Sequence, residues 1–395
     1  MILSAQQARS RLKDYLMIKE NRLISLTQKV LQINSENPPG NELALSKFIE
    51  KDMRSLGFPV KTYTFAKARP NVVAVLKGKN KKLASKKAIL ITPHFDTVPF
   101  GKGWKHDPLG GEIKNGRIYG RGATDDKGNL ACAMEVMRSL VEDKVKFDYD
   151  IIFAATVDEE TGSRYGIIPL LEKDIIKPEV ALVLDSDEFY SIIAQKGLMH
   201  GRIQVFGKKS HGAYNWRGVN AIELASKIIQ DFKALKFKHK KHHFLRPPTM
   251  NIGTITGGDK VNMVADFCEF SFDFRFMPDM DPKKSIKRFK SVVARHAKRA
   301  KLIIDDLQMP YEIDPTHDLV KIYENTCKRM KRPTTLKGSE GATVITFFQK
   351  KKIPAIATGY GSSKTAHTTD EYAHVKKLCD GAKVLEQFLK DFDER

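Results

Sequence analysis

The chain of 395 residues is 41% hydrophobic, and because domains usually hold about 100–200 residues, this length favours two domains. Its 68 Lys and Arg outnumber its 47 Asp and Glu, so the formal charge is +21, which raises the question of an acidic partner such as nucleic acid or an anionic membrane. The four cysteines lie far apart with no CxxC pair, which argues against a disulfide framework and a cysteine zinc site and favours a reducing cytoplasm.

The basic residues gather in three runs, at 77–87, 233–243 and 283–301. The last two also carry the apolar spacing of helices, so we interpret the runs as a loop and solvated helix faces rather than as a nucleic-acid surface. The first 31 residues have no long apolar stretch and are interrupted by charged residues. They predict a helix, and neither a signal peptide nor a membrane span.

The first half of the chain alternates helices with strands. Helices are predicted at 19–33 and 42–56, separated by a break rich in Pro, Gly and Asn. Strands follow at 71–76 and 88–92, and the second strand ends on His94 and Asp96. Polar residues at the point where a buried strand emerges are typical of a functional site.

The same plan is repeated further along the chain. A small-residue helix at 129–141 follows Asp125, a strand at 150–157 leads directly to Glu159 and Glu160, and a strand at 180–184 ends on Asp185. Strands and helices in this order predict an α/β layer whose ligand site lies at the carboxyl edge of the sheet.

The stretch from 197 to 307 has a different pattern. Its strands and helices alternate in a way that suggests a small α+β insert, with elements expected at 201–206, 221–232, 250–255, 266–276 and 282–299. Beyond it, helices are predicted at 318–331 and 343–350, and a strand at 355–358 leads to His367.

Two imidazoles and three carboxylates therefore stand at the ends of separate elements. They are His94, Asp125, Glu160, Asp185 and His367. Zinc binds nitrogen and oxygen ligands, and a pair of zinc ions needs a bridging carboxylate. Each residue alone is more simply explained as a cap, a core histidine or a solvated acid, but the five together point to a metal site.

Five ordered motifs carry a resemblance to a known family: PHFDTVPFGKGW, GRIYGRGATDDKG, DEETGS, KKSHGAYNWRGVNAIE and AHTTDEY. Over nearly its full length the chain resembles the acetylornithine deacetylase and succinyl-diaminopimelate desuccinylase family, which also holds aminoacylases, carboxypeptidases and dipeptidases with two zinc ions. The resemblance implies a zinc-exopeptidase-like catalytic domain at 1–196 and 308–395, with a mixed central sheet flanked by helices. It also implies an inserted ferredoxin-like lid and dimerisation domain at 197–307.

The resemblance implies a role for each of these residues. Asp125 would bridge two Zn²⁺ ions, for which Co²⁺ or Mn²⁺ are possible substitutes. His94 and Asp185 would complete one site, and Glu160 and His367 the other. Glu159 would be the general base for attack by metal-bound hydroxide on the amide carbonyl.

Other residues are expected to support the reaction. Asp96 is predicted to accept a hydrogen bond from the imidazole of His94 and so fix its tautomer. By resemblance, His211 would reach the active site of a partner subunit and bind the oxyanion, which makes a homodimer the working unit. Arg275, with Asn262 as a weaker candidate, would hold a substrate carboxylate. The resemblance also implies a cis peptide bond after Asp125.

We therefore expect a deacylase of N-acyl amino acids, acting on a small-molecule substrate and not on a membrane. A dipeptidase or carboxypeptidase of the same family is the alternative, favoured by Asp126 and by the run from Asp185 to Asp187. A more distant alternative is a basic nucleic-acid-binding protein with a structural metal centre.

Overall fold

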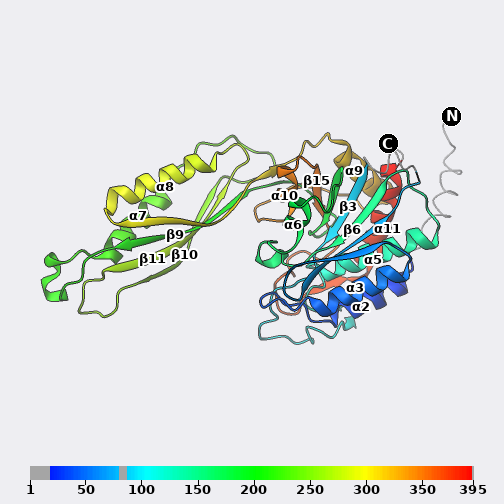
Figure 1. Ribbon diagram of the computed structural model, residues 1–395, viewed down its shortest axis with the longest axis horizontal. Coiled ribbons are helices and arrows are strands. Elements are labelled where there is room, and N and C mark those ends of the chain that lie inside the picture. The colour runs from blue at the N-terminus through cyan, green and yellow to red at the C-terminus, as the bar shows by residue number, and fades with distance from the viewer. Residues whose placement is uncertain (1–17, 80–86, 394–395) are drawn as a thin grey trace. The chain divides into compact units, whose positions relative to one another are not determined.

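The computed structural model describes residues 18–79 and 87–393 (Figure 1). The predicted N-terminal helix before residue 18, and residues 80–86 of the first basic run, lie outside this range. The chain forms two compact units. Unit 1 is Met1–Ile193, Ile313–Lys337 and Thr343–Arg395, and unit 2 is Ala194–Glu312 and Gly338–Ala342.

A large mixed sheet forms the centre of unit 1 and confirms the predicted α/β fold. In the described part of the chain its strand order is β1-β2-β6-β3-β7-β15-β8-β13, with β14 paired to β8. Pairing is parallel between β6 and β3, β3 and β7, and β7 and β15. The strands are β1 (Val60–Ala66), β2 (Arg69–Leu76), β3 (Ala88–Pro93), β6 (Asp150–Ala155), β7 (Val180–Leu184), β8 (Ser191–Gln195), β13 (Tyr311–Glu312), β14 (Leu336–Ser339) and β15 (Ala355–Thr358).

The parallel strands β3, β6 and β7 are buried along their whole length, because helices pack against the sheet (Figure 1). Among these helices, α5 contacts α2 and α11, and α11 contacts α9. The helices of unit 1 are α2 (Glu20–Leu31), α3 (Leu43–Ser55), α5 (Lys127–Glu142), α6 (Ile167–Glu172), α9 (Asp318–Arg329), α10 (Ile345–Lys350) and α11 (Val375–Asp393). No helix in the described ranges is long and apolar enough to cross a membrane.

A second, smaller sheet in unit 1 joins two segments that are far apart in the sequence. Its strands are β4 (Ile113–Lys114), β5 (Arg117–Tyr119) and β16 (Tyr372–His374), in the order β16-β5-β4. Tyr372 pairs with Tyr119, so the loop that follows β5 lies beside the loop that precedes β16. Asp125 and His367 belong to these two loops.

Unit 2 has a four-stranded antiparallel sheet in the order β10-β11-β9-β12. Its elements follow the order βαββαβ, namely β9 (Gly197–Phe206), α7 (Ala221–Ala234), β10 (Thr249–Gly257), β11 (Phe267–Phe276), α8 (Pro282–His296) and β12 (Ala300–Gln308). This connectivity is that of a ferredoxin-like fold. Alternate residues of β11 are buried, and their phenylalanines pack with Phe232 of α7 and Phe289 of α8.

The observed elements differ from the predicted ones mainly where strands are short or polar. Strands β1 and β12 were not predicted, because their exposed and half-buried residues give no long apolar run. Strand β8 was not predicted either, because its buried apolar run is only three residues long between Ser191 and Gln195. Segment Gly338–Ala342 belongs to unit 2, whereas the predicted scheme places it in the second catalytic segment. The side chain of Glu340 explains this grouping, since it pairs with Lys196 at 2.5 Å and accepts a hydrogen bond from the backbone N–H of Arg246 at 2.9 Å.

Candidate active site

The central parallel strands of unit 1 place polar residues at one edge of the sheet. His94 directly follows β3, Glu159 and Glu160 follow β6, and Asp185 directly follows β7. Because β6, β3 and β7 are neighbours and parallel, their carboxyl ends lie side by side. The sheet therefore brings these four side chains together at the position where α/β folds bind ligands.

Three of these side chains, together with Asp125 and His367, form two groups that could each hold a metal ion. In each group one ligand atom from every residue lies within 4.8 Å of the others. The groups are His94 with Asp125 and Asp185, and Asp125 with Glu160 and His367. Asp125 belongs to both, and its two carboxylate oxygens face different imidazoles: Oδ1 lies 3.0 Å from Nε2 of His94 and Oδ2 lies 3.1 Å from Nε2 of His367.

The electrostatics of the cluster fit a pair of bound cations. Burial, reinforced by repulsion from Asp125 and Glu160, raises the pKa of Asp185 to about 7. Oδ2 of Asp185 is buried and has no hydrogen-bond partner in the described part of the chain. Hydrogen bonds to Asp125 and Glu160 raise the pKa of His367 to about 10. Half-buried carboxylates that repel one another, one with a buried and unsatisfied oxygen, suit a site for divalent metal ions.

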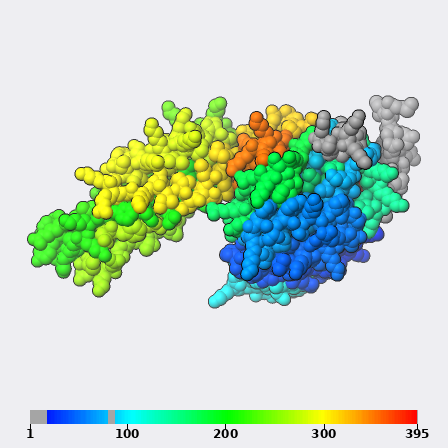
Figure 2. Space-filling model, in the orientation of Figure 1, coloured from blue at the N-terminus to red at the C-terminus, as the bar shows by residue number. Residues whose placement is uncertain are grey.

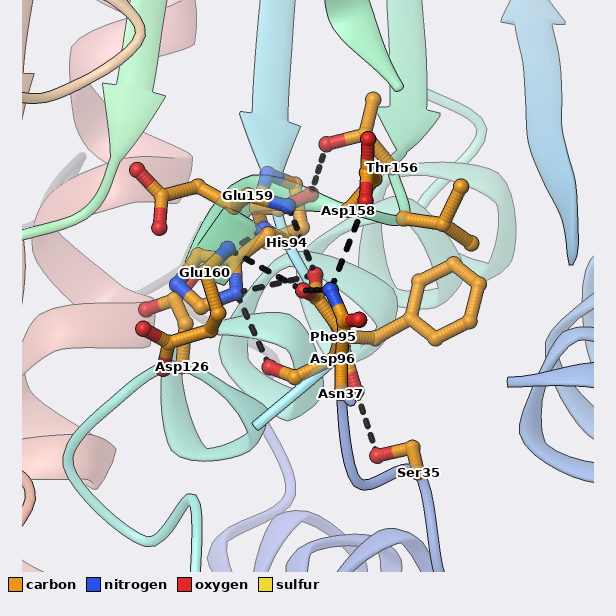
Figure 3. A network of polar contacts seen from close by, with 12 residues as sticks. Ser35, Asn37, His94, Phe95, Asp96, Asp126, Thr156, Asp158, Glu159 and Glu160 are labelled. Atoms are coloured by element: carbon orange, nitrogen blue, oxygen red, sulfur yellow. Dashed lines mark hydrogen bonds and ion pairs between the residues drawn. The ribbon is translucent and has the colours of Figure 1, made fainter. Parts of the chain in front are cut away.

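Glu159 lies beside this cluster and has a free carboxylate. It opens a short 3-10 turn, η1 (Glu159–Thr161), after Asp158, whose φ of 68° is left-handed. Figure 3 shows the side chains of Glu159 and Glu160 leaving this turn in different directions. Burial and repulsion from Asp185 raise the pKa of Glu159 well above its ordinary value. Within the described ranges no hydrogen-bond donor contacts its carboxylate, so the group is available for proton transfer.

The carboxylate of Asp96 holds the turn that carries both glutamates. Oδ1 accepts a hydrogen bond from the backbone N–H of Glu159 at 3.1 Å, and Oδ2 accepts one from the N–H of Glu160 at 3.1 Å (Figure 3). Nδ1 of His94 lies 3.0 Å from the backbone carbonyl oxygen of Asp96 and 3.5 Å from its carboxylate. The closest acceptor for the imidazole is thus the main chain of Asp96, while the carboxylate of Asp96 positions Glu159 and Glu160.

Asn37 and Arg69 contact the residues of this turn. The sequence did not predict a role for either of them. Nδ2 of Asn37 donates to Asp96 at 2.8 Å (Figure 3). It also donates to the hydroxyl of Thr161 at 3.0 Å. Nη1 of Arg69 lies 2.9 Å from the carboxylate of Asp158. Both residues are buried and far in sequence from the groups they contact. The Asn-Pro-Pro-Gly break before helix α3 was the only sequence signal for Asn37.

Glu371 performs a similar task for Asp125. Its Oε1 accepts hydrogen bonds from the backbone N–H groups of Thr124 at 2.9 Å and Asp125 at 3.1 Å. Its Oε2 accepts a hydrogen bond from Arg121 at 2.7 Å. The motif AHTTDEY contains Glu371, but nothing in the sequence shows that this glutamate contacts the loop of Asp125.

Asp126 is fully buried, and its carboxylate hydrogen-bonds to other residues of the protein. Its Oδ2 accepts a hydrogen bond from the backbone N–H of His94 at 3.1 Å, and its Oδ1 accepts one from Asn129 at 2.6 Å. The expected cis peptide bond between Asp125 and Asp126 is present. Because both carboxylate oxygens bind the protein, Asp126 no longer favours one substrate class over another.

The remaining predicted residues lie in unit 2, at two separate places. Arg275 pairs with Leu198 of β9 at one end of the sheet. The loops of His211 and Asn262 lie beyond the other end, where the backbone N–H of Gly212 donates to the carbonyl of Asn262 at 2.8 Å. With a rise of about 3.3 Å per residue, the length of β11 separates these places by roughly 25 Å. Arg275 and Asn262 therefore do not form one binding site in the same unit.

Both His211 and Arg275 retain a free donor. Nδ1 of His211 accepts a hydrogen bond from the N–H of Ala213 at 3.1 Å, so the neutral ring carries its proton on Nε2, and the side chain is exposed. Arg275 binds Asp273 through Nε at 2.8 Å and Nη2 at 3.1 Å. Its Nη1 is buried without a hydrogen-bond partner in the described part of the chain.

Comparison with known proteins agrees with this geometry. The model of peptidase family M20/M25/M40 matches residues 90–391. Acetylornithine deacetylase of Photorhabdus laumondii subsp. laumondii is 30% identical over 318 residues, which cover 77% of this chain and 80% of that protein.

Solved structures share the fold at lower identity. Aminopeptidase PepT of Bacillus cereus has a TM-score of 0.78 and 23% identity, covering 95% of this chain and 99% of its own. The metallo-carboxypeptidase Sso-CP2 of Sulfolobus solfataricus has a TM-score of 0.79 and 19% identity, covering 94% and 99%. The chain belongs to peptidase family M20/M25/M40 and is a metal-dependent hydrolase of amide bonds.

Proposed function

We propose that the protein is a cytoplasmic, homodimeric deacylase that hydrolyses the amide bond of a small N-acyl amino acid, such as an N-acetyl or N-succinyl compound. The observation that carries the proposal is the position of Asp125, which offers one oxygen to each of two ligand groups. The relative that is 30% identical, an acetylornithine deacetylase, supports the substrate class. Four free, buried cysteines agree with a reducing compartment.

Two zinc ions are the metals we assign to this site, with His94 and Asp185 holding one, Glu160 and His367 the other, and Asp125 both. Imidazole and carboxylate donors also suit Co²⁺ and Mn²⁺. When bound, such a pair polarises the scissile carbonyl, lowers the pKa of water and stabilises the developing negative charge.

Glu159 acts as general base and then as general acid. Its carboxylate accepts a proton from the attacking water and later transfers it to the nitrogen of the leaving amine. Asp96 contributes by fixing the backbone of the turn, so that Glu159 faces the reacting atoms while Glu160 faces the metal site. The burial that raises the pKa of Glu159 favours its protonated form, and the positive charge of bound metal ions would favour the carboxylate that accepts the proton.

The inserted domain supplies two further groups in this proposal. The free Nη1 of Arg275 binds the substrate carboxylate, while Asp273 orients the guanidinium. The Nε2–H of His211 donates to the oxyanion. Because about 25 Å of strand separates Arg275 from His211, one small substrate cannot contact both residues of the same chain. The resemblance to the deacetylase and desuccinylase family assigns His211, and not Arg275, to the active site of the partner subunit, and unit 2 to dimerisation.

A dipeptidase is the second candidate, and Asp187 favours it. This half-buried residue follows Asp185 by two positions, and no ion pair or hydrogen bond to its carboxylate is present among the described residues. Burial, reinforced by Glu188, raises its pKa. A carboxylate at this position would attract the free ammonium group of a dipeptide, which an N-acyl amino acid lacks.

A substrate panel tests the proposal. Metal-free protein is reloaded with zinc, and kcat/KM is measured for N-acetyl amino acids, N-succinyl amino acids and dipeptides with a free amine. The proposal expects hydrolysis only after zinc is added and a preference of at least tenfold for an N-acyl compound. A preference for dipeptides that the variant Asp187→Asn abolishes would instead establish the dipeptidase.

A further inference from the structure

In unit 2, basic residues greatly outnumber acidic residues. It contains 23 Lys and Arg but only 12 Asp and Glu. The excess concentrates in helix α8 and in the loop that follows α7. Helix α8, drawn in yellow, is exposed on the surface shown in Figure 2.

A cavity of about 500 Å³ lies where this loop meets the start of α8. Four cationic residues line it, Lys236 and Lys238 from the loop and Lys284 and Arg288 from α8. The two α8 residues are four positions apart and so lie on one face of the helix. The size is within the range of small-molecule binding sites.

The cations of the cavity are not neutralised by the protein. None of the four has a carboxylate within ion-pair distance in the described part of the chain. Some cations elsewhere in unit 2 are paired, for example Lys209 with Asp259 at 2.7 Å and Arg202 with Asp305 at 3.0 Å. The cavity is distinguished by four unpaired cations that line one hollow of the surface.

Two aspartates also line the cavity, and one carboxylate oxygen of each accepts a hydrogen bond from a backbone N–H. Asp279 accepts a hydrogen bond from the N–H of Lys240 at 2.8 Å, and Asp281 accepts one from the N–H of Lys283 at 2.8 Å. These contacts order the loop and the helix that present the cations. The aspartates thus shape the cavity without supplying a partner for the lysines.

Arg288 is held in place by two further contacts. Its Nη1 donates to the carbonyl of Lys236 at 2.7 Å, and its guanidinium lies 4.7 Å from the centre of the ring of Phe237. The ring of Phe237 also packs on Phe274, with 4.6 Å between ring centres. The loop is therefore anchored to both α8 and the sheet, which makes the cavity a formed site and not a chance gathering of mobile side chains.

We propose that this cavity binds a phosphate-bearing anion with several negative charges. Such an anion relieves the mutual repulsion of the four cations, and lysine and arginine are the usual ligands of phosphate oxygens. The anion is either a small polyphosphate or a short stretch of a nucleic-acid backbone, since both present phosphates to the same cations. The site is separate from the catalytic residues of unit 1, so it stands whether or not the proposed reaction is correct.

Two probes test this site in the full-length protein. Inorganic tripolyphosphate is titrated by calorimetry, and a fluorescent ten-nucleotide RNA is titrated by anisotropy at low and physiological salt. The cavity variant combines Lys236→Gln, Lys238→Gln and Lys284→Gln. A control variant combines Lys47→Gln, Lys51→Gln and Lys61→Gln, which removes the same charge from exposed lysines of unit 1.

The cavity variant is expected to bind at least about tenfold more weakly than the wild type, because three phosphate contacts are lost, while the control changes less than about twofold. Loss of tripolyphosphate binding identifies a small anion, and loss of RNA binding alone identifies a nucleic acid. A phosphate probe that bound to the catalytic metal ions instead would still bind to the cavity variant. Equal binding by both variants, or no binding of either probe by the wild type at low salt, overturns the proposal. An unchanged melting temperature shows that the variants are folded.

Discussion

Glu159 and Glu160 are adjacent in the η1 turn but have different environments. The proposed reaction depends on this difference. Glu160 lies 3.1 Å from His367 through its Oε1 and belongs to a metal-ligand group. The carboxylate of Glu159 has no such partner among the described residues. One short turn thus supplies both a ligand and a base, because consecutive side chains leave it in different directions (Figure 3).

Glu159→Gln tests the role of the base. The amide keeps the size of the side chain but cannot accept the proton of water, so kcat is expected to fall by about 10²–10⁴-fold. Zinc content, measured by mass spectrometry, stays at the wild-type value because Glu159 is not a ligand. Glu172→Gln, an exposed change on α6, is the matched control and leaves kcat unchanged. Retention of full activity by Glu159→Gln would remove the assigned base.

Asp96→Asn tests whether the carboxylate positions the turn. The amide offers one acceptor in place of two, so one of the N–H groups of Glu159 and Glu160 loses its hydrogen bond. We expect zinc affinity to fall by about 10–100-fold and kcat to fall more than KM rises. Asp107→Asn in the loop after β3 is the control. Unchanged zinc affinity in a folded Asp96→Asn protein would show that the carboxylate does not act on the turn.

At the scale of elements, the position of the site follows from strand order. Residues at the ends of β3, β6 and β7 could be predicted to meet because apolar runs ending in polar residues are visible in the sequence. The two loops joined by the β16-β5-β4 sheet could not be predicted from such patterns. Their strands have two or three residues, and Glu371 acts on a backbone more than 200 positions away.

The same limit applies to Asn37 and Arg69. Their roles depend on buried side-chain contacts with Asp96 and Asp158, made across 59 or more positions. The sequence marks Asn37 only as part of a turn and Arg69 only as a cation at the start of β2. Contacts of this kind appear only when the fold has brought the elements together.

A substitution at Gly381 in helix α11 tests the packing between this helix and Tyr360. A Cβ at Gly381 would lie 2.0 Å from Cγ of the fully buried Tyr360, so Gly381→Ala must push the helix or the ring away. We expect a loss of about 3 kcal/mol or more in the free energy of unfolding. Denaturant titration measures it, with Lys376→Ala on the same helix, a side chain that is 80% exposed, as a control that changes stability by less than about 0.5 kcal/mol. A neutral Gly381→Ala would contradict the observed packing.

For the whole molecule, the proposed role of His211 in the active site of the partner subunit makes a prediction about mixed dimers. If each active site uses its own Glu159 and the His211 of the partner subunit, mixing two inactive variants restores function. Glu159→Gln and His211→Ala chains, unfolded and refolded together, should form mixed dimers that hold one complete site, recovering about a quarter of wild-type activity. Refolding each variant alone is the control. No recovery in mixed dimers of verified composition would place His211 outside the partner's site.

Anomalous diffraction at the zinc edge, from crystals of the zinc-loaded protein, tests the central claim most directly. The account predicts two peaks about 3.5–4 Å apart on either side of the Asp125 carboxylate, one beside His94 and Asp185 and the other beside Glu160 and His367. Peaks bound elsewhere in the chain, or a single ion that Asp125 does not contact, would contradict it.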